Sequence, residues 1–215
     1  ANFGFDVIPE TRTALKILIM INLIRSVWVV MTTVLLVCPL DLSADTDLGY
    51  IEKNVIYTNG GIDLGGTICK PAGAGPWPAV IYNHGGLGHI IGGAPEETCQ
   101  ALAKAGFIGF SPIRRPTRLL FGHLDDVLAA LNYIKSQSFV DGSRIAMMGF
   151  SRGGMLTYQA AIIRTELKAV VIMAIAVNRI VDLSVAGAVT APVLLLVAQN
   201  DTGSRRTRGR NTLQG

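Results

Sequence analysis

The chain has 215 residues, of which half are hydrophobic and 24 are glycine. This length and composition suit one compact domain with a sizeable hydrophobic core. The formal charge of +4 lies near the ends, because 12 Lys and Arg residues balance 12 Asp and Glu residues between Asp45 and Ser204. A basic chain can bind nucleic acid or an anionic membrane, but here the body has no basic excess. We therefore expect no nucleic-acid partner.

The N-terminal residues have the layout of a secretory signal peptide. After Met20, a short segment with Arg25 precedes an apolar run over 27–37, and small residues then allow cleavage after Ala44. The alternative is an uncleaved membrane anchor over 14–38, which is long enough to span a bilayer if the arginine is tolerated. We expect a secreted or periplasmic protein, with a membrane-anchored one as the second choice.

The sequence divides into three parts. Residues 1–44 hold upstream sequence and the signal peptide or anchor, 45–203 form the folded domain, and 204–215 form an aberrant or disordered tail rich in arginine. Within the domain, Cys69 and Cys99 could form a disulfide in an oxidising compartment or remain two buried thiols. The cysteines lack the spacing of metal ligands, so we expect no metal.

The first predicted elements are a β-hairpin, a buried strand, a helix and a second strand. The hairpin spans 50–71 and turns at Asn59-Gly60, a strong turn signal. The strand Ala79–Asn83 follows, then a helix over 95–106 that begins with Pro95 and ends at a glycine, then a strand over 107–112.

The second half of the domain continues the alternation of helices and strands. A helix over 121–137 places five apolar residues on one face: Leu124, Val127, Leu128, Leu131 and Ile134. Strands are predicted at 144–149, 169–176 and 192–201, with a helix over 152–164. The last two strands are apolar without alternation, which indicates a mostly parallel sheet covered by helices on both faces. The fold class is α/β.

The sequence Gly149-Phe150-Ser151-Arg152-Gly153-Gly154 lies between a predicted strand and a predicted helix. In this context G-x-S-x-G forms a sharp turn that presents the serine hydroxyl as a nucleophile. The backbone N–H of Arg152 then points at the developing oxyanion, and a second donor would be the N–H of Gly86 or Leu87 in the loop after the strand Ala79–Asn83. Such donors stabilise a transition state by roughly 3–4 kcal/mol each.

Four segments together resemble the α/β-hydrolase superfamily, most closely its dienelactone hydrolase-like and prolyl oligopeptidase-like members. They are YNHGG at 82–86, DDVLAALNYI at 125–134, DGSRIAMMGFSRGGMLT at 141–157 and APVLLLVAQND at 191–201. The resemblance covers roughly 50–201. It implies an α/β-hydrolase fold, hydrolysis of carboxylic esters or peptide bonds through an acyl-enzyme, and no cofactor.

The resemblance assigns Ser151 as nucleophile and Asp201 as the acid that orients a histidine, while His84 and Gly85 support the oxyanion loop. The family's histidine follows the acid by about thirty residues. The fourteen residues after Asp201 contain none. We expect the family's last strand and helix to be missing as well, which leaves 192–198 as an exposed edge. The alternative function is therefore a catalytically inactive hydrolase fold or a binding module.

The remaining charged residues have simpler interpretations. His89 lies in the oxyanion loop without support from the family as a base, and His123 is expected at the surface. Asp125 and Asp126 are expected on a solvated helix face. The arginines after the strand over 107–112 are expected to be solvated loop charges, with binding of a substrate carboxylate as the alternative: Arg114, Arg115 and Arg118, together with Arg152.

Overall fold

The computed structural model describes residues 49–86, 90–117, 120–176, 182 and 184–198. The strands are β1 (Tyr50–Asn59), β2 (Ile62–Pro71), β3 (Trp77–Asn83), β4 (Ile108–Pro112), β5 (Val140–Phe150), β6 (Val170–Met173) and β7 (Val193–Leu196). The helices are α2 (Pro95–Lys104), α3 (His123–Lys135), α4 (Arg152–Ile163) and the short 3₁₀ helix η1 (Ala186–Ala188). Each element predicted for the domain is present, with ends that shift by a few residues.

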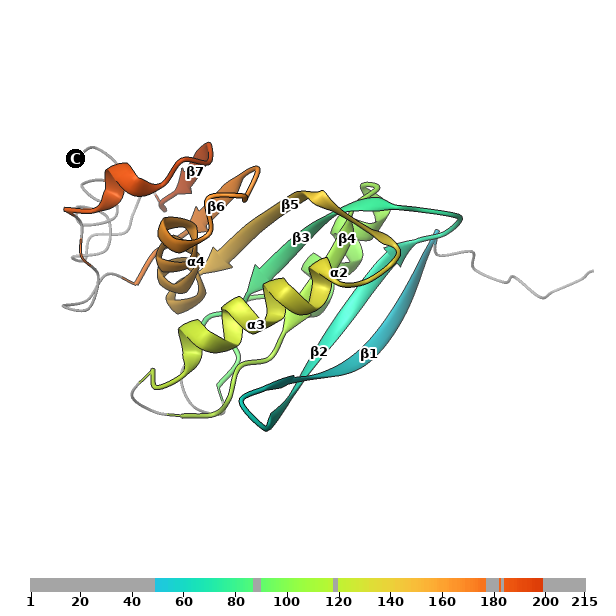
Figure 1. The fold of residues 1–215 in the computed structure, drawn as a ribbon, viewed down its shortest axis with the longest axis horizontal. Helices are drawn as coiled ribbons and strands as arrows, with labels where there is room; N and C mark the ends of the chain where they lie inside the picture. The colour runs from blue at the N-terminus through green and yellow to red at the C-terminus, as the bar shows by residue number, and fades with distance from the viewer. Residues whose placement is uncertain (1–48, 87–89, 118–119, 177–181, 183, 199–215) are drawn as a thin grey trace, which may run out of the picture. The chain divides into compact units, whose positions relative to one another are not determined.

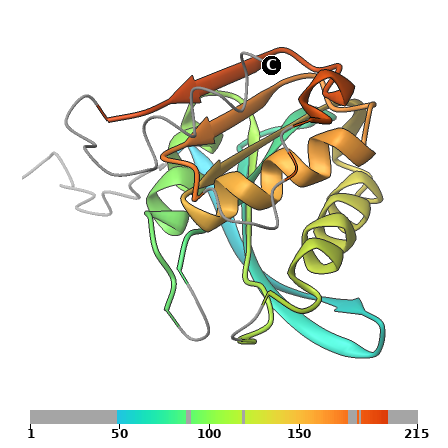
Figure 2. The same cartoon turned by 90° about the vertical axis from the view of Figure 1, so that its left-hand side faces the viewer.

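The strands form one twisted sheet in the order β1-β2-β4-β3-β5-β6-β7 (Figure 1). β1 and β2 pair antiparallel, as do β2 and β4, and the strands from β4 to β7 pair in parallel. Helices α3 and α4 lie side by side on one face, and α2 covers the other (Figures 1 and 2). The predicted mostly parallel sheet between two helical layers is confirmed.

The hairpin between β1 and β2 turns one residue later than predicted. Asn59 pairs with Ile62, so the two-residue loop is Gly60-Gly61. Both glycines have positive φ, 59° and 81°. A type I′ turn needs this conformation at both central positions, and its twist matches that of the flanking strands.

The larger hydrophobic cluster lies between the sheet and helices α3 and α4, and a smaller one, Cys69, Cys99 and Ala103, lies at α2. Ile81, Phe110 and Met147, from β3, β4 and β5, have no exposed surface. On α3, Val127, Leu131 and Ile134 are also fully buried, while the other two predicted apolar positions, Leu124 and Leu128, are partly buried. Helical periodicity therefore identified the correct face of α3.

One of the two edge strands of the described sheet is β7, and the other is β1. The residues of β7 alternate between half-buried and exposed, and Leu194 and Leu196 are 54% and 46% exposed. The expected exposed edge at 192–198 agrees with this pattern. Of the described helices, none has the length and apolarity needed to span a bilayer. The possible anchor over 14–38 and the tail over 204–215 lie outside the described residues.

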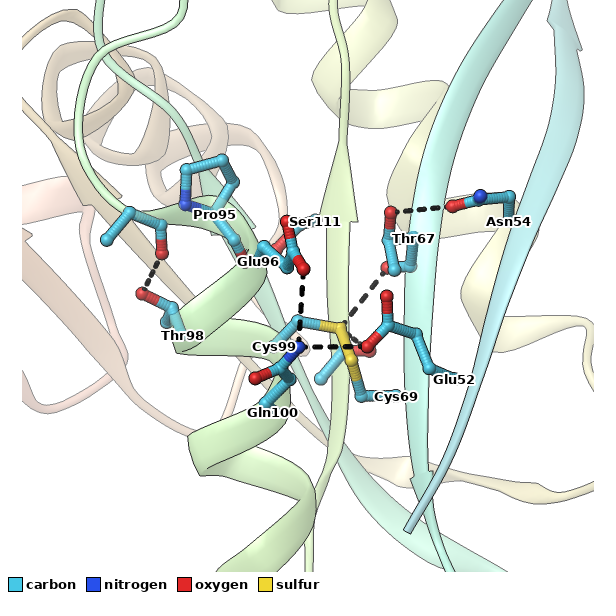
Figure 3. The surroundings of a disulfide bond; sticks show 12 residues. Glu52, Asn54, Thr67, Cys69, Pro95, Glu96, Thr98, Cys99, Gln100 and Ser111 are labelled. Atoms are coloured by element: carbon cyan, nitrogen blue, oxygen red, sulfur yellow. Dashed lines mark hydrogen bonds between the residues drawn. A yellow bond between two sulfur atoms is a disulfide. The ribbon is translucent and has the colours of Figure 1, made fainter. Parts of the chain in front are cut away.

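Helix α2 is bound covalently to the sheet. Cys69 on β2 and Cys99 on α2 form a disulfide, with a Cα–Cα distance of 5.4 Å and no exposed surface on either residue (Figure 3). The helix lies directly on β4, because a Cβ added at Gly109 would come within 2.8 Å of the Cys99 Cα. The sequence allowed either a disulfide or two buried thiols at these positions, and the structure contains the disulfide.

Candidate active site

Ser151 occupies the turn between β5 and α4 in a conformation that few non-glycine residues adopt. Its φ is 55° and its ψ is −111°. Its backbone N–H donates to the Met173 carbonyl at 2.9 Å, and its carbonyl accepts from the N–H groups of Met155 and Ala176 at 3.2 and 3.0 Å. These bonds hold the serine at the C-terminal ends of the parallel strands, where α/β proteins bind ligands.

Two glycines of the motif permit this turn because neighbouring backbone fills the space of a side chain. A Cβ at Gly153 would overlap the carbonyl oxygen of Asn83, at the end of β3. A Cβ at Gly149 would overlap the backbone of Gly153, and it would also crowd the Thr157 hydroxyl. The motif therefore brings the first turn of α4 against two strands at once.

The loop after β3 lies beside the serine. A Cβ added at Gly85 would be 3.3 Å from the Ser151 Cβ and 2.9 Å from the Phe150 ring. The loop is folded back by reciprocal hydrogen bonds between Gly85 and Gly92, with N···O distances of 2.8 and 3.1 Å. Gly86 follows with φ 87°, and a Cβ there would overlap the Ile90 carbonyl oxygen.

The structure thus places two of the predicted oxyanion-hole residues, Gly86 and Arg152, and the predicted support residue Gly85 next to Ser151 or one residue further along the chain. Gly85 contacts Ser151, Gly86 is the next residue, and Arg152 is the first residue of α4. The first N–H groups of a helix have no partner within the helix, so the Arg152 N–H is available to an oxyanion. Leu87 and Asp201 lie outside the described residues.

His84 is buried and neutral. Its Nδ1 is 2.7 Å from the Gly85 carbonyl oxygen, and its Nε2 is 3.4 Å from the Arg114 backbone N–H. Burial, and then the charge of Arg114, lower the pKa of His84 to about 4. The arrangement fits a ring whose Nδ1–H donates to Gly85 and whose Nε2 accepts from Arg114. This geometry agrees with the predicted supporting role of His84 in the oxyanion loop.

The expectation that Arg114 is a solvated loop charge is wrong. The residue is only 4% exposed, and its Nη2 donates to the His84 carbonyl oxygen at 2.7 Å. Burial, followed by the charge of Arg152, lowers the pKa of Arg114 to about 10. The guanidinium lies beside the loop after β3, because β3 and β4 are parallel neighbours and the chain leaves both at the same edge of the sheet.

The expectation of a solvated Asp126 is also wrong. Asp126 has no exposed surface, and Arg115 donates to it from its backbone N–H and its guanidinium, both at 3.0 Å. Asn59, in the β1–β2 hairpin, donates at 2.8 Å. Burial alone raises the pKa of Asp126, but the hydrogen bonds from Arg115 and Asn59 outweigh it and lower the pKa.

His123 is buried as well, at 2% exposure, and not at the surface as expected. Its Nε2 is 3.0 Å from the Arg115 carbonyl oxygen and 2.9 Å from the Thr117 hydroxyl. The segment after β4 folds over the start of α3 and covers the ring. Helical spacing could have revealed this, since positions 123 and 126 share a face with the buried Val127 and Ala130.

Neither described histidine is hydrogen-bonded to Ser151 in the part of the chain that the structure covers, and His89 lies outside it. The same part contains no group of three His, Cys, Asp or Glu side chains that could hold a metal ion.

Comparisons with known proteins find relatives for part of the chain. The model of the prolyl oligopeptidase family matches residues 122–186, which include the serine turn. The uncharacterised peptidase YtmA of Bacillus subtilis is 28% identical over 115 residues, which are 50% of this chain and 44% of that protein. The chain therefore spans less than half the length of this relative.

Solved structures share the fold. A Klebsiella pneumoniae protein described as a dienelactone hydrolase has a TM-score of 0.59 and 22% identity, over 76% of this chain and 80% of its own. The chain is a member of the α/β-hydrolase superfamily. An esterase from Pyrobaculum calidifontis has a TM-score of 0.52 and 26% identity, over 60% of this chain and 46% of its own.

Membership of the α/β-hydrolase superfamily confirms the predicted fold and the resemblance. In hydrolases of this superfamily a serine turn with positive φ is the place of the nucleophile. Here that place is occupied by Ser151, with the loop after β3 beside it. The catalytic roles of the individual residues stay predictions.

Proposed function

We propose that the chain is a serine hydrolase that cleaves carboxylic esters or peptide bonds, with Ser151 as the nucleophile. The observation that carries this proposal is the strained turn at Ser151, φ 55°, with Gly85 of the neighbouring loop packed against the serine Cβ. Such strain is typical of sites where the chemistry requires a side chain in one fixed place.

In the proposed reaction, the Ser151 hydroxyl attacks the substrate carbonyl and forms an acyl-enzyme, which water then hydrolyses. The N–H of Arg152 and that of Gly86 or Leu87 stabilise the oxyanion. His84 maintains the loop by bonding to Gly85, its other ring nitrogen faces the Arg114 N–H, and its pKa of about 4 makes it a weak base, so we do not assign it as the base. The family's base is a histidine about thirty residues after the acid, which here would be oriented by Asp201, and the fourteen residues given after Asp201 contain no histidine.

The named relatives leave two substrate classes, since they include a peptidase and an esterase. The strands and turn described above suit acyl transfer to water from either class, because both pass through a tetrahedral oxyanion. Substrate choice depends on the side chains that border the serine, among which the Arg152 side chain is the first candidate.

A fluorophosphonate probe tests the proposal, because it labels a serine only when a base has activated it. We expect the folded chain to be labelled at Ser151, located by mass spectrometry, and the Ser151→Ala variant to remain unlabelled. Labelling of neither protein, with circular dichroism showing both to be folded, would support the alternative of an inactive hydrolase fold that serves as a binding module.

We also propose that the protein is exported, to the periplasm or outside the cell. The buried disulfide between Cys69 and Cys99 supports this location, because disulfides persist in oxidising compartments and are rare in the cytosol. N-terminal sequencing of the protein from its native cells tests it. A mature end at Asp45 is expected, and a chain that retains residues 14–38 in the membrane fraction would favour the anchor.

A further inference from the structure

A cluster of buried polar atoms without hydrogen-bond partners lies beside the oxyanion loop. The atoms belong to Tyr57, Arg114, His123 and Arg152, and they are the Tyr57 hydroxyl, Arg114 Nε and Nη1, His123 Nδ1 and Arg152 Nη1. Buried polar atoms are nearly always hydrogen-bonded, and an unsatisfied one costs about 1–3 kcal/mol. Five such atoms on four residues indicate a partner that the described residues do not supply, and a sixth unpaired atom, the acceptor Asn83 Oδ1, lies at the end of β3.

The four side chains are close enough to act on one another electrostatically. Arg114 interacts with Arg152 and with Tyr57, and His123 interacts with both arginines. They come from four separate parts of the chain: strand β1, the segment after β4, the start of α3 and the start of α4. Their convergence is produced by the fold and could not be read from spacing in the sequence.

The cluster carries an excess of positive charge. Arg114 and Arg152 contribute two cations, whereas the neighbouring Arg115 is ion-paired with Asp126 and also interacts with Asp125. The Asp126 carboxylate already accepts hydrogen bonds from Arg115 and Asn59. Arg114 is 4% exposed and has no ion pair within the described residues, whereas buried charges are normally paired.

We propose that this cluster is an anion-binding site, in which Arg114 and Arg152 donate to a carboxylate or a similar small anion beside the oxyanion loop. The unpaired groups of Arg114, Arg152 and Tyr57 are donors, and guanidinium forks match the geometry of a carboxylate. His123 Nε2 donates to the Arg115 carbonyl oxygen, so its Nδ1 becomes a donor only when the ring is protonated. Tyr57 and His123 complete the site from β1 and α3. The ligand is either the acid group of an anionic substrate, a version that rests on the proposed function, or a free anion that fills the site permanently.

Binding to the Ser151→Ala variant tests the site without any need for turnover. The probes are monomethyl adipate, which carries one ester and one carboxylate, dimethyl adipate, which is neutral, and acetate, which has the carboxylate alone. Affinities are measured by isothermal titration calorimetry at constant ionic strength. We expect one of the two carboxylates to bind, and dimethyl adipate to bind at least tenfold more weakly or not at all.

Substitutions within the cluster show whether the anion uses these donors. Adding Arg152→Gln should weaken binding by about tenfold or more, because a charge-assisted bond is lost. Arg152→Lys should restore part of it. The matched control is Arg144→Gln, which removes an arginine that is 57% exposed and paired with Asp141 near the other end of β5, and which should leave binding unchanged. Tyr57→Phe, which keeps the ring, should weaken binding several-fold.

The outcomes separate the two sources of the anion. Monomethyl adipate that binds at least tenfold more tightly than acetate supports a substrate carboxylate, whereas equal affinities support a free anion. The site is disproved if neither carboxylate binds, if the neutral diester binds equally well, or if both cluster variants bind as the parent does. If the Arg152→Gln variant does not fold, the affinity of the Tyr57→Phe variant for the carboxylate probe tests the site by itself. Absence of fluorophosphonate labelling would argue against the proposed reaction, but the binding measurements could still be interpreted because they do not depend on turnover.

Discussion

The backbone conformation of Ser151 lowers the stability of the folded domain while it positions the side chain at the candidate site. Its φ of 55° and ψ of −111° place the Cβ against neighbouring backbone, and three backbone hydrogen bonds from elsewhere hold it there. The strain costs about 1–3 kcal/mol in comparable positions. The rest of the domain must supply that free energy.

A comparison of two variants isolates this strain. Ser151→Ala keeps the Cβ and the strain, whereas Ser151→Gly removes both. We expect the glycine variant to have a free energy of unfolding higher than that of the alanine variant by about 1 kcal/mol, after allowing for the greater freedom of glycine in the unfolded chain. Urea unfolding monitored by circular dichroism measures it. A glycine variant that is less stable than the alanine variant would show that the turn is relaxed.

His84 makes the stability of the domain depend on pH. Its pKa is about 4 in the folded protein, because of burial and of Arg114. In the unfolded chain the pKa of histidine is about 6.5. The unfolded state therefore binds a proton first as the pH falls, so the stability from this group is complete above about pH 6.5 and is lost progressively toward pH 4.

We expect the free energy of unfolding to fall by about 2 kcal/mol between pH 7 and pH 5 through His84, with a further loss from His123, whose pKa is also lowered by burial. Urea titrations at the two pH values measure this. His84→Gln is the control, since it removes the titrating group and should reduce the dependence on pH. A wild-type protein of equal stability at both values would mean that His84 is solvated or paired.

Among the elements, α4 depends most on the absence of side chains. Its first turn contacts the end of β3, where a Cβ on Gly153 would overlap the Asn83 carbonyl oxygen, and Gly154 lies near the Met173 carbonyl oxygen of β6. Most of the helix is buried. Its position is thus fixed by backbone contacts with strands on both sides of β5.

Gly153→Ala is expected to destabilise the protein by about 1–3 kcal/mol and to reduce fluorophosphonate labelling of Ser151, because the helix must move away from β3. Helix propensity alone predicts the opposite sign, since alanine favours a helix by about 1 kcal/mol over glycine. Gly65→Ala is the matched control, because a Cβ there meets nothing within 4 Å. Thermal melting of both variants measures the difference, and equal midpoints would refute the close approach.

The sequence predicted the elements well, since periodicity and turn residues are local. It identified the buried face of α3 and the serine turn, whose glycines stand beside Ser151 in the chain. It failed for Arg114 and Asp126, because Arg114 is bound by His84 after β3, and Asp126 by Asn59 of β1 and Arg115 after β4. A charged residue whose partner lies on another element looks the same in sequence as a solvated one.

Across the whole domain, the disulfide adds a covalent link between two layers that also share packing and hydrogen bonds, such as those from Gln100 to Glu52 and from Ser111 to Pro95. Cys69 lies in the antiparallel hairpin strand β2 and Cys99 in α2, so the bond closes a loop with a sequence separation of 30. Strand β3 and the folded loop at Gly85–Gly92 are contained in that closed loop. In the unfolded chain, the disulfide therefore restricts the conformations of the segment between Cys69 and Cys99. In the folded protein, part of this segment borders Ser151.

For a closed loop of this length, the loss of entropy in the unfolded chain predicts a stabilisation of about 3–4 kcal/mol. We expect the double variant Cys69→Ala, Cys99→Ala to lose a free energy of unfolding of this size, measured by urea unfolding. Reduction of the wild-type protein with dithiothreitol in urea should give a similar loss, while the double variant should not respond to the reductant. A wild-type protein that is equally stable with and without reductant would show that the cysteines are free thiols, and it would remove the main support for export.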